Sequence, residues 1–445
     1  MCRAEVTDGS AGSPCHNACM TVIDLGPFPD AEGYERAQEL DAADPLSDQR
    51  SGFVVDEPDL IYLDGNSLGR LPKPAIGTIE EVTHNQWGKR LIRSWNEGWW
   101  ELQLEIGDLL APLLGASPGE VMISDSTSVN TYKLVDAAVS ATDRRKIVTD
   151  DLNFPTDVYI LDGVAKRHSM SLEIIESDGV HGPVGQLAEA IDEDTALVSL
   201  SHTTFKSGYT YDLELLTSIA HDAGAMVLWD CSHSVGALPI ELNAADVDLA
   251  IGCTYKYLNG GPGSPAFLYV RADLQNSLDN PITAWWGHAE PFSFDLEFQP
   301  VTGIRRFHTG TMPILSLAAI EAGIRGLLDA GIDHVRSKSI ALSEFLIDQW
   351  RAHLASHGFS LASPTEFERR GSHISLSHDQ AWPVTKAMIE QALVLPDFRA
   401  PDNIRLGLSP LYTTFTEIHT AIQRIKGIID SGAHATYMNV TATVT

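Results

Sequence analysis

Short apolar runs alternate with longer amphipathic stretches from about residue 120 onward. Each run is apolar at successive positions and is bounded by Asp, Ser, Gly or Pro, which is typical of strands buried on both faces beneath crossover helices. The runs lie at 121–124, 146–149, 196–200, 225–229, 249–252 and 266–270. This alternation predicts βαβ units in an α/β domain with a doubly wound, mainly parallel sheet.

The last third of the chain has a different pattern. Residues 283–313 are rich in Trp, Phe and Gly and show neither the helical nor the strand period, so their length and aromatic content indicate a functional loop. Apolar residues then recur at helical spacing over 342–354 and 415–425, and residues 373–378 and 403–409 have the composition of strands. We expect a smaller α+β domain here.

The length of 445 residues allows two or three domains. The patterns divide the chain into an N-terminal extension over residues 1–55, a large domain over 56–325 and a small C-terminal domain over 326–445. About the first 20 residues show no element period, and we expect them to be flexible.

The formal charge of −30, from 60 acidic and 30 basic residues, narrows the set of partners. Such a field repels phosphate backbones and anionic lipid surfaces, so neither nucleic acid nor a membrane is expected as a partner. No apolar run approaches the roughly 20 residues of a membrane helix, and the first residues lack the basic-then-apolar order of a signal peptide. The sequence therefore predicts a cytoplasmic protein.

The five cysteines are too scattered for a disulfide framework. The segment 15–19 (CHNAC) contains possible metal ligands, but no second ligand pair follows at zinc-finger spacing. We therefore predict no metal site.

Two charged residues follow neighbouring apolar runs directly. Asp230 follows the run 225–229, and Lys256 follows the run 249–252, so both are expected at the carboxyl edge of the sheet, where α/β folds bind ligands. A carboxylate there can keep the pyridine nitrogen of a cofactor protonated, and a desolvated lysine can form a Schiff base. These are the two anchors of pyridoxal 5′-phosphate chemistry, although a structural ion pair would explain either residue taken alone.

A possible phosphate site lies between the first strand and the helix that follows it. Residues 125–128 (DSTS) precede a stretch with apolar residues at Val129, Tyr132, Val135 and Val139, a helical spacing. The free N–H groups and the dipole of a helix N-terminus favour an anion. Ser and Thr at these positions would also serve as plain helix caps.

Several segments together resemble the kynureninase family. The segment 62–69 (YLDGNSLG) is similar to the family's N-terminal signature, and 153–157 (NFPTD) is similar to its cofactor-stacking segment. Further matches are 230–233 (DCSH), 255–259 (YKYLN), 285–288 (WWGH) and 305–311 (RRFHTGT). The resemblance spans about residues 55–430, and the order of the segments makes it specific. It implies a fold-type-I, aminotransferase class-V-like enzyme that uses pyridoxal 5′-phosphate, with a mainly parallel seven-stranded sheet in the large domain.

The resemblance assigns roles around the cofactor. It implies that Lys256 carries the cofactor and moves the α-proton of the substrate, and that Asp230 pairs with the pyridine nitrogen. Phe154 would stack on the cofactor ring. The same matches imply a set of residues that binds the cofactor phosphate and a set that lines the cofactor ring. The phosphate site is Thr127, Ser128 and Tyr255, and the ring-lining set is Asp157, Ser201 and His233. Trp285 and Thr311 would reach the cofactor of a neighbouring subunit, which implies a functional homodimer.

The resemblance also implies the substrate and the reaction. The family cleaves the Cβ–Cγ bond of L-kynurenine with water, giving anthranilate and L-alanine in tryptophan catabolism, and Tyr255 would be the general acid. Arg405 would hold the α-carboxylate of the substrate as a planar fork, and Ser67 in the signature would lie beside it. Trp95 would lie near the substrate ring and, with Thr311, suggests L-kynurenine over its 3-hydroxy form. Trp95 is equally well explained as a core or interface residue.

Three other functions compete with this one. A cysteine desulfurase needs a nucleophilic cysteine beyond the cofactor lysine, and the last cysteine here is Cys253. A class V aminotransferase or a β-lyase for another amino acid is disfavoured by the segments 64–69 and 286–288. A non-catalytic cofactor-binding paralogue would have no need for Lys256, Asp230, Tyr255 and Arg405 together.

Overall fold

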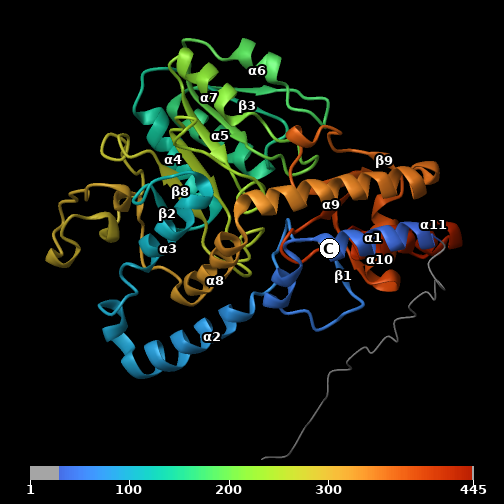
Figure 1. The fold of residues 1–445 in the computed structure, drawn as a ribbon. Helices are drawn as coiled ribbons and strands as arrows, with labels where there is room; N and C mark the ends of the chain where they lie inside the picture. The colour runs from blue at the N-terminus through green and yellow to red at the C-terminus, as the bar shows by residue number, and fades with distance from the viewer. Residues whose placement is uncertain (1–29, 443–445) are drawn as a thin grey trace, which may run out of the picture.

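A seven-stranded sheet forms the centre of the structure, a computed structural model that describes residues 30–442 (Figure 1). The strand order is β2-β8-β7-β6-β5-β3-β4. Strand β8 (Phe267–Val270) runs antiparallel to its neighbours β2 (Val121–Ile123) and β7 (Leu249–Gly252), and the other pairs are parallel. The predicted mainly parallel seven-stranded sheet is therefore confirmed.

The burial of the strands explains which of them the sequence pattern revealed. Every residue of β5 (Thr195–Ser201), β7 and β8 is buried, which is why these strands read as continuous apolar runs. Strands β3 (Lys146–Asp150) and β6 (Met226–Asp230) are buried except at their first residues. Strand β4 (Ser171–Ile175) lies at the edge of the sheet with no buried residue, so it left no apolar run.

Helices cover both faces of this sheet. Leu197 of β5 packs in a cluster with α4 (Thr127–Ser140) and α5 (Pro155–His168), whereas its neighbour Val198 packs in another cluster with helices of the opposite layer. The opposite layer consists of α3 (Leu102–Leu110), α6 (Val184–Ala190), α7 (Leu213–Asp222) and α8 (Ile314–Ala330). Because strand side chains alternate between faces, one strand supplies both cores.

A second sheet has four antiparallel strands in the order β12-β13-β10-β9. Its strands are β9 (Ser360–Leu361), β10 (His373–Ser377), β12 (Asp397–Arg399) and β13 (Asn403–Gly407). Its helices are α9 (Ile332–His353), α10 (Ala381–Ala392) and α11 (Phe415–Ser431). The predicted α+β character of the last third is confirmed.

The first described elements pack with the last ones. Helix α1 (Ala31–Ala43) lies along α11 in Figure 1, and β1 (Ile61–Tyr62) pairs in parallel with β11 (Val394–Leu395). Ala37, Ile61 and Leu63 belong to the same apolar cluster as the helices of the C-terminal part. The exact division of the chain into domains stays a prediction.

Two segments project from the body on the left of Figure 1. One is α2 (Lys73–Glu81) with the π-helical turns at 82–90 that follow it, and the other is the loop within 283–313. The loop contains only short 3₁₀ turns, at Trp285–Gly287, Pro291–Ser293 and Ile304–Phe307. This agrees with the irregular structure expected from its sequence.

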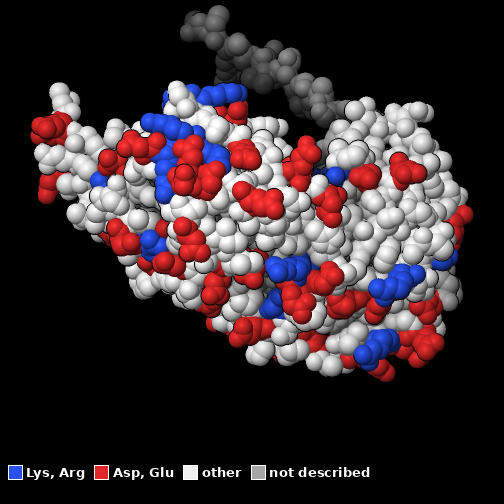
Figure 2. All heavy atoms as spheres, turned by 90° about the horizontal axis from the view of Figure 1, so that it is seen from above, with Lys and Arg blue, Asp and Glu red and all other residues white. Residues whose placement is uncertain are grey.

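Three expectations from the sequence concern the charge of the surface, membrane-spanning helices and the cysteines. Acidic side chains are spread over the face shown in Figure 2, with smaller groups of basic side chains between them. Within residues 30–442, no helix has both the length and the apolar composition needed to cross a membrane. Cys231 and Cys253 are buried and unpaired, while the segment 15–19 and the expected flexible start lie outside the described residues.

Candidate active site

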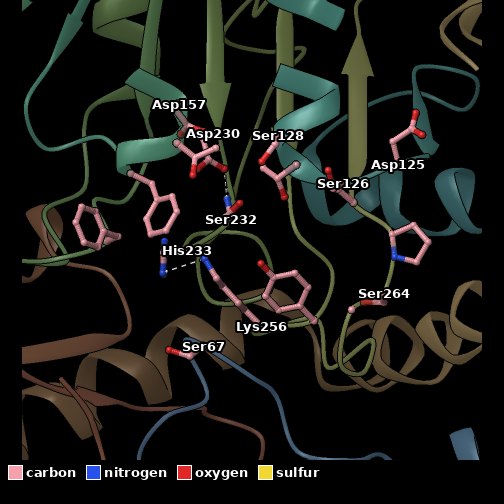
Figure 3. A pocket seen from close by; sticks show the side chains of 18 of the residues that line it. Ser67, Asp125, Ser126, Ser128, Asp157, Asp230, Ser232, His233, Lys256 and Ser264 are labelled. Atoms are coloured by element: carbon pink, nitrogen blue, oxygen red, sulfur yellow. Dashed lines mark hydrogen bonds between the residues drawn. The ribbon is translucent and has the colours of Figure 1, made fainter. Parts of the chain in front are cut away.

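A cavity of about 510 Å³ opens at the carboxyl edge of the large sheet (Figure 3). Residues that directly follow β2, β3, β6 and β7 line it, as expected for a ligand site in an open α/β sheet. Of the residues that the sequence singled out, it is lined by Ser67, Thr127, Ser128, Phe154, Asp157, Asp230, His233, Tyr255, Lys256 and Arg405. Side chains more than 300 residues apart in the sequence, from Ser67 to Arg405, therefore meet in one place.

Lys256 lies in a turn after β7 and points into the cavity. Its Nζ lies 3.2 Å from Nε2 of His233. Burial, with the positive charge of Lys256 beside it, lowers the pKa of His233 well below its usual range. The imidazole therefore stays neutral, and its Nε2 can accept a hydrogen bond from Nζ of Lys256.

A glycine brings the 62–69 segment against this turn. The N–H of Gly69 donates to the Tyr255 carbonyl at 2.8 Å. A Cβ at position 69 would lie only 2.8 Å from Cα of Asn259 and still closer to the Lys256 carbonyl oxygen. Only glycine allows this approach, which explains one residue of the signature in physical terms.

Two carboxyl groups face each other on the wall opposite Ser67 (Figure 3). Asp230 ends β6 and accepts a hydrogen bond from the Ser232 N–H at 2.8 Å, and Asp157 lies in the first turn of α5. Burial, reinforced by the nearby Asp230 carboxylate, raises the pKa of Asp157 well above its usual range. Asp157 therefore holds a proton that it can donate to Asp230.

The N-terminus of α4 supplies an anion cradle. Ser126 is the N-cap, and its hydroxyl accepts from the Val129 N–H at 3.3 Å. Thr127 and Ser128 form the first turn and line the cavity, and the first N–H groups of a helix have no partner within the helix. Among the Ser and Thr residues at 125–128, Ser126 is the one that caps the helix.

A buried lysine on α4 fixes the residue before this cradle. Nζ of Lys133 lies 2.8 Å from Oδ2 of Asp125 and 2.8 Å from the Phe307 carbonyl, and its side chain is fully buried. Asp125 has a φ of +47° and also accepts from the Thr309 hydroxyl at 2.9 Å. Lys133 thus ties the cradle to the loop that carries Trp285 and Thr311. We name Asp125, Lys133, Phe307 and Thr309 the cradle anchor.

The far side of the cavity is cationic. Arg405 on β13 is almost fully buried, and its guanidinium pairs with Asp397, donates to Ser67 Oγ at 3.1 Å and donates to the Phe205 carbonyl. Asp397 is thus a buried anionic partner for Arg405 within the chain. Arg399, which the sequence reasoning missed, also lines the cavity and pairs with Asp397 at 2.8 Å.

Four of the predicted residues do not line the cavity. Ser201 is buried at the end of β5, paired in register with Asp230, and donates its N–H to Asn153. Trp95 packs edge-on against Trp286 with 5.6 Å between ring centroids. The remaining two, Trp285 and Thr311, are exposed on the projecting loop. Their assigned roles stay predictions.

The cavity also contains residues that the sequence reasoning did not assign. They are Thr156, Phe205, Ser232, Gly263, Ser264, Pro265, Ala266, Pro313 and Arg399, while Asp125 and Ser126 belong to the expected phosphate site at 125–128. Phe205 packs perpendicular to Phe154 at 5.3 Å and orients that ring. The glycine-rich stretch after Lys256 could have indicated that Gly263 and Ser264 lie at the site. The charged pair within 397–399 could have indicated the same for Arg399.

Solved structures of other proteins share this fold. The apo structure of a cysteine desulfurase from Thermococcus onnurineus NA1 has a TM-score of 0.73 at 17% sequence identity, covering 88% of this chain and 98% of that chain. The complex of the cystine C–S lyase C-DES with cysteine persulfide has a TM-score of 0.72 at 19% identity, covering 83% and 98%. The chain therefore has the same fold as these two enzymes.

Sequence relatives identify the family of this chain. The chain is 43% identical over 399 residues to kynureninase of Pseudomonas fluorescens, covering 88% of this chain and 94% of the relative. It is 40% identical over 405 residues to kynureninase of Burkholderia pseudomallei (strain K96243), covering 90% and 96%. A family profile described as the kynureninase C-terminal domain matches residues 335–425. The chain belongs to the kynureninase family.

Proposed function

We propose that this protein is an enzyme that hydrolyses the Cβ–Cγ bond of L-kynurenine, giving anthranilate and L-alanine, with pyridoxal 5′-phosphate as its cofactor. Membership of the kynureninase family supports the reaction. The observation that carries the proposal is that Lys256, Asp230 and the N-terminus of α4 open into one cavity. An amine, a carboxylate and an anion cradle are the groups that this cofactor needs.

The residues present fit the cofactor. Lys256 would hold it covalently, Asp230 would pair with its pyridine nitrogen, and Phe154, whose side chain is only partly buried, would cover its ring. Its phosphate would lie at Thr127, Ser128 and Tyr255, and Asp157, Ser201 and His233 would surround the ring. When bound, pyridoxal 5′-phosphate supplies an electron sink that acidifies the C–H bond beside the substrate amine.

Two side chains would move the protons of the reaction. Lys256 would transfer the proton at Cα of the substrate. The neighbouring Cys253 sulfur and burial raise the pKa of Tyr255, so its phenol keeps the proton that a general acid must deliver to Cβ of the alanine product. The oxygen of the water consumed ends in the carboxylate of anthranilate, which balances the cleavage.

The direct test is product analysis with two substrates. Purified protein with pyridoxal 5′-phosphate is incubated with L-kynurenine and, in parallel, with 3-hydroxykynurenine, and both the aromatic product and alanine are measured. We expect equal amounts of anthranilate and alanine, a higher kcat/KM for L-kynurenine, and no turnover by Lys256→Ala. The exposed control Lys166→Ala should retain full activity. Turnover by Lys256→Ala, or a keto acid in place of alanine, would refute the proposal.

The active unit is proposed to be a homodimer in which Trp285 and Thr311 reach the neighbouring site. Support comes from large apolar side chains on the two projecting segments: Trp87 is 57% exposed, Phe294 is 79% exposed and Leu296 is fully exposed. Such apolar surface is usually covered by a partner. Neither Trp285 nor Thr311 lines the cavity of its own chain.

Mixing two inactive variants tests this arrangement. Lys256→Ala and Trp285→Ala subunits each give weakly active or inactive homodimers. In a mixed dimer, one site has both native residues if Trp285 comes from the partner. We expect activity to rise on mixing towards one quarter of the wild-type value, as random pairing makes half of the dimers mixed. No rise, with subunit exchange shown by mass, would contradict the shared site.

A further inference from the structure

The cationic side of the cavity carries more positive than negative charge. Strands β12 and β13 pair so that Asp397 lies opposite Arg405, and Arg399 lies two residues along β12. Both arginines form ion pairs with Asp397, whose side chain is 2% exposed. Two guanidinium groups thus share one buried carboxylate. We name Asp397, Arg399 and Arg405 the arginine pair cluster.

The other nearby carboxyl does not balance this charge. Arg399 and Arg405 are both close enough to Asp64 to act on its charge, yet burial outweighs them and raises the pKa of Asp64 above its usual value. Its Oδ1 has no hydrogen-bond partner within the described part of the chain. The excess positive charge therefore faces the cavity and favours an anion there.

The two arginines differ in the donors they have left. Both terminal nitrogens of Arg405 are already bonded, to Asp397 and Ser67 on one side and to the Phe205 carbonyl on the other. Arg399 bonds through Nη1 only, to Asp397 at 2.8 Å and to the Phe398 carbonyl at 3.1 Å. Its side chain is 33% exposed, and its Nε, like that of Arg405, has no partner among residues 30–442, so the two arginines differ at their terminal nitrogens.

This anion site is separate from the cradle on α4. Ser67, which bonds to Arg405, lies across Lys256 from Ser128 and Asp230 in Figure 3. The cavity therefore has one anion site on each side of the lysine. A ligand with a carboxylate beside its amine would place that carboxylate at the arginine side while its amine approaches Lys256.

We propose that Arg399 is a second substrate-binding arginine, which holds the α-carboxylate of the amino-acid substrate together with Arg405, while Asp397 holds the two guanidinium groups in position. This inference rests on the proposed function. A planar guanidinium with free donors suits a carboxylate, which accepts two parallel hydrogen bonds. Asp397 also reduces the repulsion between the two arginines before substrate enters.

The test uses two inhibitors that each lack one group of L-kynurenine. The first, 4-(2-aminophenyl)-4-oxobutanoate, keeps the carboxylate and lacks the α-amine. The second, kynuramine, keeps the amine and lacks the carboxylate. Competitive Ki values are measured on cofactor-loaded wild type, Arg399→Gln, Arg399→Lys and Arg351→Gln. Arg351 is an exposed arginine on α9 that pairs with Asp348 in the same helix, so it is the matched control.

We expect Arg399→Gln to raise the KM for L-kynurenine and the Ki of the oxobutanoate at least tenfold, and to leave the Ki of kynuramine within twofold. Arg399→Lys keeps the charge and loses the forked pair of donors, so the ratio between its changes in the two Ki values should be smaller. This variant replaces Arg399→Gln in the test if the glutamine variant fails to fold. Arg351→Gln should change neither Ki.

Two results would overturn the inference. Equal changes for both inhibitors would make Arg399 a structural residue, and no change for either would remove it from the site. Failure of the proposed function looks different, because wild type would then not convert L-kynurenine to anthranilate and alanine at all. If wild type converts L-kynurenine but Arg399→Gln changes the two Ki values equally, only the role of Arg399 is refuted.

Discussion

Replacing Lys133 by Met tests whether the cradle anchor stabilises the fold. The substitution keeps the length of the side chain and removes the ammonium, so the Asp125 carboxylate loses its charged partner and the Phe307 carbonyl loses a buried donor. Breaking a buried ion pair from one side costs about 3–5 kcal/mol. The Asp125 side chain is 22% exposed and keeps the hydroxyl of Thr309, so we expect a smaller loss here, about 2–3 kcal/mol.

Scanning calorimetry of the cofactor-loaded protein provides the measurement. At roughly 2–4 °C per kcal/mol for large domains, Lys133→Met should lower Tm by about 5–10 °C. The double variant Lys133→Met/Asp125→Asn should recover more than half of this loss, because no unpaired carboxylate remains. Lys166→Met, at an exposed pair with Asp162, should change Tm by less than about 2 °C. A Tm for Lys133→Met within about 1 °C of wild type would refute the reasoning.

Two further predictions concern the backbone and a buried acid. Gly69→Ala should lower kcat/KM at least tenfold, because the added Cβ pushes the Lys256 turn away. Gly163 on α5 has open space around it, so Gly163→Ala should leave activity unchanged and raise stability by about 0.5–1 kcal/mol. Equal kcat/KM values for the two variants would contradict the close approach at Gly69. Burial raises the pKa of Asp150 to about 6, so the folded state keeps a proton that the unfolded state loses near pH 4, and wild-type stability falls as the pH rises through this window. Asp150→Asn has no such group to titrate, so its Tm relative to wild type should increase between about pH 4 and pH 7, by the equivalent of at most about 3 kcal/mol. A Tm difference that stays constant over this pH range would contradict the prediction.

The large sheet was predictable because its central strands are covered on both faces. Burial of every position in β5, β7 and β8 leaves continuous apolar runs, which no surface strand produces. The pairing of Ile61 with Val394 was not predictable, because β1 and β11 are two residues long and their contact joins distant parts of the chain. Local periodicity carries no information about such a pairing.

The predictable part of the site follows from the same geometry. Asp230 ends a buried strand and Lys256 lies shortly after the next one, so their meeting at one sheet edge could be inferred from the order of apolar runs and charged residues alone. Arg399 escaped notice because β12 is a three-residue strand without an apolar pattern. Lys133 lies four residues after Val129, on the buried side of α4, and a lysine at such a position signals a buried acid. Identifying that acid as Asp125 required its backbone turn with positive φ.

The pairing of β1 with β11 has a consequence for synthesis of the chain on the ribosome. Ile61 and Leu63 emerge early but are covered only when the last strands and α11 have left the ribosome, tens of seconds later at typical elongation rates. Until then the segment with Ser67 can dock only on the Lys256 turn, through Gly69, so Lys256 and Asp230 can be in place while the arginine side of the cavity is still unformed. The site is therefore completed last on the substrate side, and a nascent chain without α11 would expose the apolar residues of β1 to chaperones.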